Sequence, residues 1–203
     1  MTVLGAVLPR LAAHEDELRD LDAALGDGDL GITVRAGANA VTAALAGLPA
    51  DATLDAVTKT AGKAFSTANP STFAALVGGG LLAGSKTLAG TESMDRADAL
   101  RFARAVADRI AERGKAQLGD KTVLDALLPS LDLLERAEGD TATVVAAMAA
   151  VARERVAATA SLQSARGRAA WVGERSVGHA DPGATAYAIL LELLADALGA
   201  GHE

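Results

Sequence analysis

The sequence predicts an all-α protein built as an up-and-down helical bundle or barrel. Hydrophobic residues make up 50% of its 203 residues and aromatic residues only 2%, with many alanines and leucines, a composition that favours helix over strand. Apolar residues recur at helical spacing along almost the whole chain, and no segment alternates between apolar and polar residues as a half-buried strand does. A chain of this length supports one sizeable core, so a single domain over residues 1–203 is expected.

The apolar periodicity divides the chain into eight expected helices, joined mostly by short connections. These helices cover residues 2–24, 31–46, 52–67, 71–88, 95–113, 121–137, 140–163 and 182–199. The second helix ends at Gly47, a residue type that is common just after a helix. Asp120 and Asp140 precede the sixth and seventh helices as N-cap residues. Asp181 does the same for the eighth helix, in which Pro182 takes the first helical position.

Charge and composition exclude several classes of protein. The chain has 26 acidic and 19 basic residues, a net charge of −7 and no cysteine. No cluster of basic and aromatic residues indicates nucleic-acid binding, and zinc–thiolate sites and disulfides are excluded. No apolar run reaches the roughly 18–20 residues of a membrane span, and the N-terminus lacks the basic region of a signal peptide. We therefore expect a cytoplasmic protein that binds neither nucleic acid nor membrane.

Two connections differ from the rest. Residues 25–31 form a loop of aspartates and glycines, and residues 164–181 form a long polar loop with three arginines, one histidine and the only tryptophan. Long loops in compact domains are often functional. Arg168 and Arg175 suit phosphate oxygens. His179 is either a general base or, as we favour, a hydrogen-bonded structural residue.

The end of the first helix carries an acidic residue on its apolar side. On a helical wheel Asp22 falls within the stripe of leucines that includes Leu18, whereas Asp16 and Asp20 fall on the opposite side. A buried carboxylate without a partner is unstable by several kcal/mol or more. Asp22 therefore needs a compensating group.

The loop that follows supplies more carboxylates. Asp27 and Asp29 stand in the sequence GDGD, where the glycines permit a tight backbone path that brings them towards Asp22. Three carboxylates without histidine or cysteine suit Mg²⁺, Ca²⁺ or Mn²⁺, and the N-terminus of the next helix favours an anion such as phosphate. Alternatively, Asp27 and Asp29 are turn residues, and Asp22 caps the helix or pairs with an arginine. An EF-hand is excluded, because Ala38 stands at its twelfth position.

The glycine-rich segment LVGGGLLAGSKTLAG, residues 76–90, is not a P-loop. Ser85 rather than lysine follows Gly84, and no strand precedes the segment. We favour close packing of a helix against a neighbour through its glycines. The alternative is approach of the backbone to a phosphate, which glycine also permits.

Three segments together resemble a known family. LD-x4-GDGDLG, GDKTVLDALLPS and GRAAWVGERSVGHADPGAT are similar, in order and spacing, to segments of the L subunit of dihydroxyacetone kinase, the DhaL or Dak2-type nucleotide-binding domain. The resemblance covers nearly the whole chain. It implies eight antiparallel helices that form a barrel with ADP or ATP at one end, and two Mg²⁺ ions that bridge the phosphates to Asp22, Asp27 and Asp29.

The resemblance also implies the nucleotide contacts. They map onto Leu30, Gly31, Ile32, Thr33, Gly78, Gly79, Gly119, Leu128, Arg168, Asp181, Pro182 and Gly183. Phosphoryl transfer depends mainly on positioning and charge neutralisation, which the ions and Arg168 would supply, so no catalytic residue of this chain is assigned beyond the metal–phosphate site.

The family implies a partner protein. In it a separate K subunit holds the ketose through a histidine, and the L subunit brings the nucleotide against it, so that the terminal phosphoryl group passes to a substrate hydroxyl. In phosphotransferase-system versions the ADP stays bound and a third, M-type subunit rephosphorylates it, whereas in others ATP exchanges freely. Because 203 residues leave no room for a K domain, we expect a separate K-type subunit.

Three residues depart from the family pattern. Leu30 replaces the usual histidine, Thr33 replaces asparagine, and Gly79 replaces a serine in the segment that aligns with VGGG. These changes indicate a divergent member, and they leave open another acceptor, such as a tetrulose, another sugar or a fatty acid. A non-catalytic nucleotide-binding regulator is the third alternative.

Overall fold

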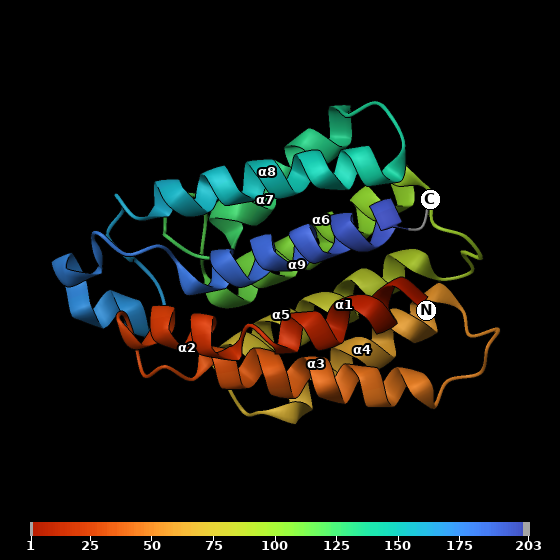
Figure 1. Ribbon diagram of the computed structural model, residues 1–203, viewed down its shortest axis with the longest axis horizontal. Helices are drawn as coiled ribbons and strands as arrows, with labels where there is room; N and C mark the ends of the chain where they lie inside the picture. The colour runs from red at the N-terminus through yellow and green to blue at the C-terminus, as the bar shows by residue number, and fades with distance from the viewer. Residues whose placement is uncertain (1, 201–203) are drawn as a thin grey trace.

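The fold is entirely helical in the part of the chain that the structure describes, residues 2–200 of a computed structural model (Figure 1). The α-helices and two short 3₁₀-helices are α1 (Thr2–Ala12), α2 (Glu15–Ala23), α3 (Leu30–Ala46), α4 (Leu54–Ala68), α5 (Thr72–Ser85), η1 (Lys86–Leu88), α6 (Arg96–Gly114), α7 (Leu124–Arg136), α8 (Thr141–Thr159), η2 (Arg168–Ser176) and α9 (Pro182–Gly199). The all-α prediction is confirmed.

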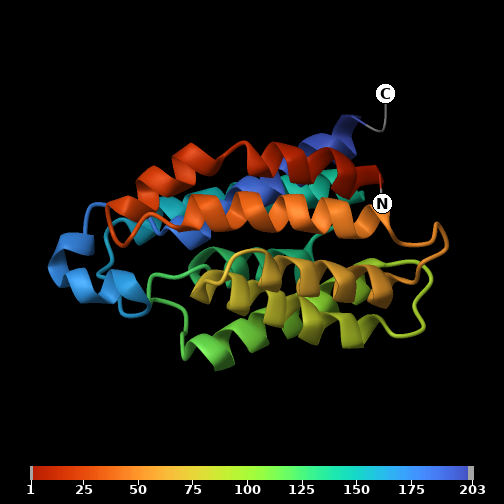
Figure 2. The same ribbon diagram turned by 90° about the horizontal axis from the view of Figure 1, so that it is seen from below.

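The helices follow one another around a closed ring. From α3 to α9 each α-helix packs on the next one in the chain, α1 packs on α3, and α9 returns to pack on α1. This order is compatible with the predicted antiparallel barrel. The start of α1 and the end of α9 lie at one end of the molecule, and η2 projects from the other end (Figures 1 and 2). Within residues 2–200, no helix has the length and apolar character that crossing a bilayer requires.

The first expected helix is two helices. The prediction of one helix over residues 2–24 is wrong, because the helix is interrupted at Ala13 and His14, between α1 and α2. The N–H groups of Ala13 and His14 donate to the carbonyls of Arg10 and Leu11, which are i→i−3 bonds that tighten and end α1. A new helix then starts with three acidic residues in its first turn, where they oppose the positive end of the helix dipole.

Asp120 is not a helix cap. Its prediction as the N-cap of the helix expected over residues 121–137 is therefore wrong. The helix begins only at Leu124, because the backbone of Lys121 has φ +60°, a left-handed conformation that cannot continue an α-helix. The Asp120 carboxylate instead accepts hydrogen bonds from the N–H of Gln117 at 3.0 Å and from Nε of Arg166 at 2.9 Å. The other two predicted caps are confirmed, since Asp140 and Asp181 accept from the third residue of α8 and α9.

The glycine-rich helix α5 packs closely against its neighbours, as the favoured interpretation of its sequence expects. A Cβ atom on Gly78 would lie 2.5 Å from Cβ of Ser66 on α4, and one on Gly84 would lie 2.8 Å from the Phe102 ring on α6. Both distances are too short for non-bonded carbon atoms. Gly79 points to open space, where an added methyl group would meet no atom within 4 Å. The core beneath includes Leu124 and Leu131, which are fully buried.

Candidate functional site

The loop between α2 and α3 is a tight turn held by backbone hydrogen bonds. The carbonyl of Asp22 accepts from the N–H groups of Leu25 and Gly26, and Gly28 adopts φ +72°. Gly31 packs directly on the backbone of α2, because a Cβ atom there would lie 2.0 Å from the carbonyl oxygen of Glu15. Glycine at this position therefore lets the start of α3 lie against the side of α2.

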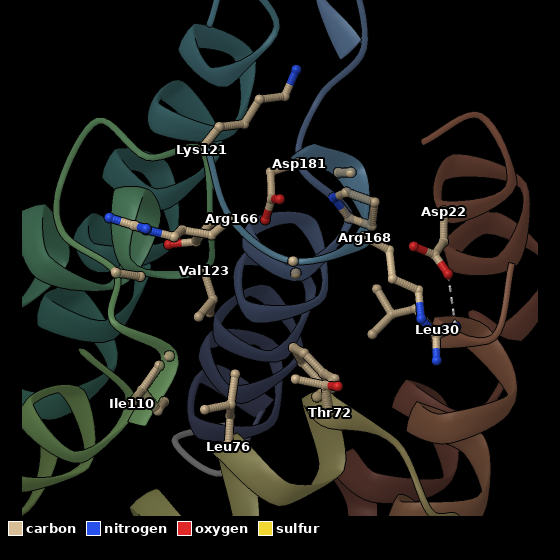
Figure 3. Close-up of a pocket in the computed structure, with 18 of the residues that line it drawn as sticks. Asp22, Leu30, Thr72, Leu76, Ile110, Lys121, Val123, Arg166, Arg168 and Asp181 are labelled. Carbon is tan, nitrogen blue, oxygen red and sulfur yellow. Dashed lines mark hydrogen bonds between the residues drawn. The ribbon is translucent and has the colours of Figure 1, made fainter. Parts of the chain in front are cut away.

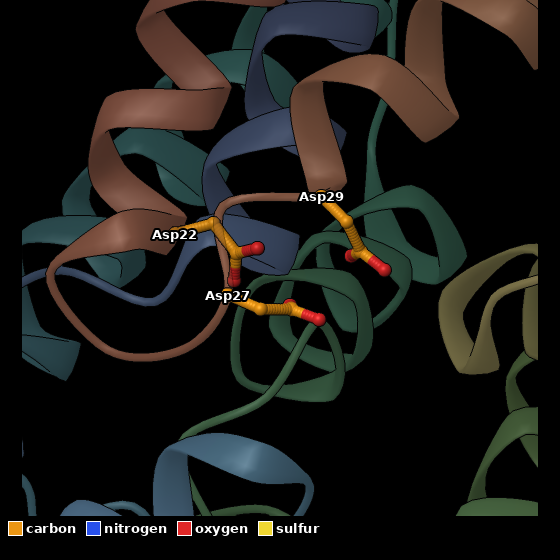
Figure 4. A group of neighbouring side chains, drawn as sticks. All are labelled: Asp22, Asp27 and Asp29. Atoms are coloured by element: carbon orange, nitrogen blue, oxygen red, sulfur yellow. The ribbon is translucent and has the colours of Figure 1, made fainter.

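This turn brings the three predicted carboxylates together. One oxygen from each of Asp22, Asp27 and Asp29 lies within 4.8 Å of the other two (Figure 4). The Oδ2 atom of Asp22 accepts from the N–H of Leu30 at 3.2 Å. Burial, and then the nearby charge of Asp22, raise the pKa of the Asp29 carboxyl. The negative charges therefore repel one another in this arrangement.

An arginine from a distant part of the chain compensates for this charge. The Nη1 atom of Arg168, the first residue of η2, forms ion pairs with Asp27 and, at 3.3 Å, with Asp29 (Figure 3 shows Arg168 beside Asp22). Asp22 forms no ion pair among residues 2–200. The arginine pair that the alternative expects for Asp22 is therefore not formed within residues 2–200, and Asp27 and Asp29 pair with an arginine instead.

The carboxylate cluster fits a hard divalent cation. It offers only oxygen donors, which Mg²⁺ prefers, and contains no nitrogen or sulfur ligand. Asp27 is exposed and the other two are partly buried, so the cluster is open to solvent on one side. The three aspartates are therefore the residues that would hold magnesium.

The cluster lies at one side of a cavity of about 230 Å³ at the end of the molecule where η2 projects. On the opposite side Leu76, Ile110 and Val123 form an apolar wall, while Thr72 and Asp181 lie between the two sides (Figure 3). One cavity thus combines an apolar wall with a group of possible cation ligands.

The cavity brings together eight of the residues expected at the site. Besides the three aspartates they are Leu30, Arg168, Asp181, Pro182 and Gly183. The last three belong to the N-terminus of α9, where the Asp181 carboxylate accepts from the N–H of Ala184 at 2.7 Å. Burial raises the pKa of Asp181 to about 7.

The other expected contacts lie outside the lining of the cavity. They are Gly31, Ile32, Thr33, Gly78, Gly79, Gly119 and Leu128. Thr33 is buried and its hydroxyl accepts from the amide of Asn69 and donates to Ser71, a link between α3 and the start of α5. The N–H of Gly119 donates to the Asp125 carboxylate at 2.6 Å, and Leu128 packs on the core. Arg175 and His179, also considered from the sequence, are exposed and away from the lining.

Sequence reasoning predicted a helix that starts at residue 71 but did not assign its N-terminus, the start of α5, to the site. Thr72 and Phe73 line the cavity, and the Ser71 hydroxyl caps the helix by accepting from the N–H of Ala74. The signal was present in the sequence, because Asn69, Pro70 and Ser71 have the turn and capping chemistry that precedes a helix. The N-terminus of this helix, rather than the glycines further along, therefore lines the same cavity as the carboxylates.

Lys121 fixes the second polar loop beside the cavity. Its ammonium group donates to the carbonyl oxygens of Leu162, at 3.0 Å, and Ser176, so it joins the end of α8 to the end of η2. Burial lowers the pKa of Lys121, and the Asp181 charge opposes that shift. Lys121 is buried and has a left-handed backbone conformation, features that periodicity does not reveal.

A known protein family matches most of this chain. Residues 24–196 match the family described as the DAK2 domain. The chain belongs to the DAK2 domain family. The matched range contains Asp27, Asp29, η2 and α9 up to residue 196. The resemblance to DhaL is therefore confirmed, and Asp22 lies just before the matched range.

Known relatives of this DAK2 domain include whole kinases and single subunits. The L-erythrulose 1-kinase of Mycolicibacterium smegmatis is 36% identical over 92% of this chain and 33% of the kinase. The ADP-binding subunit DhaL of PEP-dependent dihydroxyacetone kinase 1 of Listeria innocua is 33% identical over 91% of this chain and 88% of that subunit. The dihydroxyacetone kinase of C. freundii has the same fold, with a TM-score of 0.78 and 24% identity over 96% of this chain and 33% of that one. The chain therefore spans about one third of both kinases.

Proposed function

We propose that this DAK2 domain is the magnesium-nucleotide-binding unit of a dihydroxyacetone-type kinase. The observation that supports this most strongly is the convergence of Asp22, Asp27 and Asp29 beside a cavity whose opposite wall is apolar. The name of the Listeria innocua relative, an ADP-binding subunit, agrees with that arrangement. ADP or ATP has the matching combination of a flat base and a charged phosphate chain.

The aspartates would hold two magnesium ions, which supply positive charge to the phosphate oxygens. The chain itself contributes position and polarity. The N-terminus of α5 at Thr72 presents backbone N–H groups to an anion, and Leu76, Ile110 and Val123 receive the base away from water. Arg168 lies close enough to the carboxylates to contact a phosphate that reaches them. No group of this chain needs to remove a proton.

The acceptor would be held by another protein, a K-type subunit that presents a small ketose to the cavity end of this chain. Dihydroxyacetone is the acceptor in the names of the DhaL relatives, and a tetrulose is the second candidate because the Mycolicibacterium smegmatis relative is an erythrulose kinase. The phosphoryl donor is either exchanging ATP or an M-type phosphotransferase-system subunit that rephosphorylates bound ADP.

Calorimetry with MgADP and MgATP tests nucleotide binding. We expect heat of binding with at least one of them, and an absence of heat with both, in folded protein, would contradict the proposal. A coupled assay that contains a K-type subunit and either dihydroxyacetone or erythrulose then separates a kinase from a nucleotide-binding regulator. Phosphorylation of neither ketose despite tight nucleotide binding would favour the regulator.

The substitution Asp27→Asn tests the metal assignment. Loss of one carboxylate from three should weaken MgADP binding by at least about tenfold, since Mg²⁺ depends on charged oxygen ligands. Asp20→Asn is the matched control, because Asp20 is an exposed carboxylate on α2 that lies outside the cluster. Equal MgADP affinity in the two variants, measured by calorimetry, would contradict the assignment.

A further inference from the structure

The three carboxylates depend on one positive side chain for charge compensation. Their ion pairs within residues 2–200 all come from Arg168, and the same atom, Nη1, contacts both Asp27 and Asp29. Carboxylates within 4.8 Å of one another are stable together only if a cation lies among them or if one of them takes up a proton. In this structure the guanidinium group is that cation.

A metal ion and the Arg168 guanidinium compete for the same place. A magnesium ion bound to Asp27 and Asp29 lies about 2.1 Å from their oxygens, and Nη1 is already in contact with Oδ2 of both residues. Two cations this close would repel each other strongly in a partly buried site. Arg168 must therefore leave the carboxylates when a metal ion binds between them.

The segment that carries Arg168 has the freedom to move away. It packs extensively on none of the α-helices. Gly167 and Gly173 adopt φ +64° and +58°, and a methyl group on either would meet no atom within 4 Å. The chain is held on both sides of these glycines. Before them the N–H of Ala165 donates to the Asp120 carbonyl, and after them Ser176 accepts from Lys121 through its carbonyl and from the N–H of Ser164 through its hydroxyl. Residues 168–172 therefore form a short arm between two glycines.

We propose that Arg168 is a place-holding counter-ion, which occupies the carboxylate cluster before the metal arrives and moves η2 when the metal displaces it. This inference rests on the proposed magnesium-nucleotide function and adds a device to it. The freed guanidinium group then becomes available to the phosphate chain. Metal binding and the position of η2 are coupled through this one side chain.

The only tryptophan of the chain reports this movement. Trp171 lies three residues after Arg168 on η2 and is 85% exposed, so its emission changes when movement of the segment brings the indole against other protein groups. Mg²⁺ alone, added without nucleotide to wild-type protein, should change the emission of Trp171. The same titration followed by calorimetry gives the affinity for Mg²⁺.

The variant Arg168→Gln separates the two roles of the side chain, because the expected effects have opposite signs. Removal of the competitor should tighten binding of Mg²⁺ alone by about two- to fivefold, the range that an exposed ion pair provides. It should weaken MgADP binding, since a phosphate contact is lost. It should also abolish the fluorescence response of Trp171 to Mg²⁺. Arg175→Gln is the control, because Arg175 is an exposed arginine that lies on η2 but outside the cavity.

Equal or weaker binding of Mg²⁺ to Arg168→Gln than to the wild type would overturn the inference, as would an absence of Mg²⁺ binding by both proteins. The proposed function fails on a different observation, the absence of MgADP binding by the wild type. Tighter Mg²⁺ binding by Arg168→Gln together with no MgADP binding would therefore support the counter-ion and contradict the nucleotide assignment.

Discussion

Asp181 is a carboxylic acid that closes the buried N-terminus of α9. It accepts from the N–H of Ala184, and burial raises its pKa from 3.8 to about 7. The folded state then binds a proton more tightly than the unfolded state over this pH range. Stability contributed by the protonated group is present below pH 4 and is lost as the pH rises to about 7, by roughly 4 kcal/mol in total.

The substitution Asp181→Asn should remove this pH dependence, because asparagine keeps the capping oxygen but carries no charge. We expect the metal-free variant to be more stable than the wild type at pH 8 and to show a flatter stability profile between pH 5 and 8. Thermal unfolding in a chelating buffer measures both. An unchanged slope in the variant would show that another group causes the pH dependence.

Single residues also show how far the sequence predicts the site. A helical wheel and a glycine-rich turn identify Asp22, Asp27 and Asp29, because these residues lie close together in sequence and local geometry brings them together. The ion pair with Arg168 spans 139 residues to Asp29. Pairing at that distance depends on how the whole ring of helices closes, so the sequence identifies the arginine without identifying its partners.

At the scale of helices, α5 depends on glycine at one position and only tolerates it at the next. A methyl group on Gly78 would lie 2.5 Å from Cβ of Ser66 and 2.6 Å from the carbonyl oxygen of Gly62, whereas one on Gly79 would meet no atom within 4 Å. Close approach of α4 and α5 therefore requires glycine at position 78.

The pair Gly78→Ala and Gly79→Ala tests this packing. Gly78→Ala should destabilise the protein by about 1–3 kcal/mol through overpacking. Gly79→Ala should stabilise it by about 0.5–1 kcal/mol, since alanine is the better helix former. Urea unfolding of both variants gives the two differences, and equal stability of the variants would contradict the predicted close contact.

The sequence predicts the helix boundaries well where an apolar repeat continues over many residues. It predicts them less well where local polar groups determine where a helix starts or ends. α3, α4, α6 and α9 lie close to their expected ranges. The break between α1 and α2 and the late start of α7 escape prediction, since both depend on backbone conformations at Ala13, His14 and Lys121 that apolar spacing does not encode. For the break between α1 and α2, the sequence does offer one signal, the three acidic residues in the first turn of α2.

At the scale of the whole molecule, exposed apolar side chains gather at the cavity end. Ile32 is in the first turn of α3, Leu118 is in the connection before α7, and Trp171 and Val177 are in and beside η2. Each is at least 42% exposed. Apolar side chains around a polar site are typical of a surface that contacts another protein.

The substitution Trp171→Ala should therefore weaken association with the proposed K-type subunit by about tenfold or more, because exposed tryptophans are frequent energetic centres of interfaces. MgADP affinity should stay within about twofold, since Trp171 does not line the cavity. Met94→Ala is the control, because Met94 is also an exposed apolar residue but lies far from the cavity. It precedes the N-terminus of α6, and only the C-terminal part of α6 lines the cavity. Biolayer interferometry with the paired subunits would measure both, and equal losses from the two variants would contradict a localised contact.

The start of α1 and the end of α9 lie at the same end of the molecule, opposite η2 (Figures 1 and 2). An affinity tag or a biotin anchor attached at either end would therefore hold the protein on a sensor surface with the mouth of its cavity directed towards the solution. Ligand, metal and protein partner could then be injected in any order over one immobilised sample, without the anchor competing for the face that receives them.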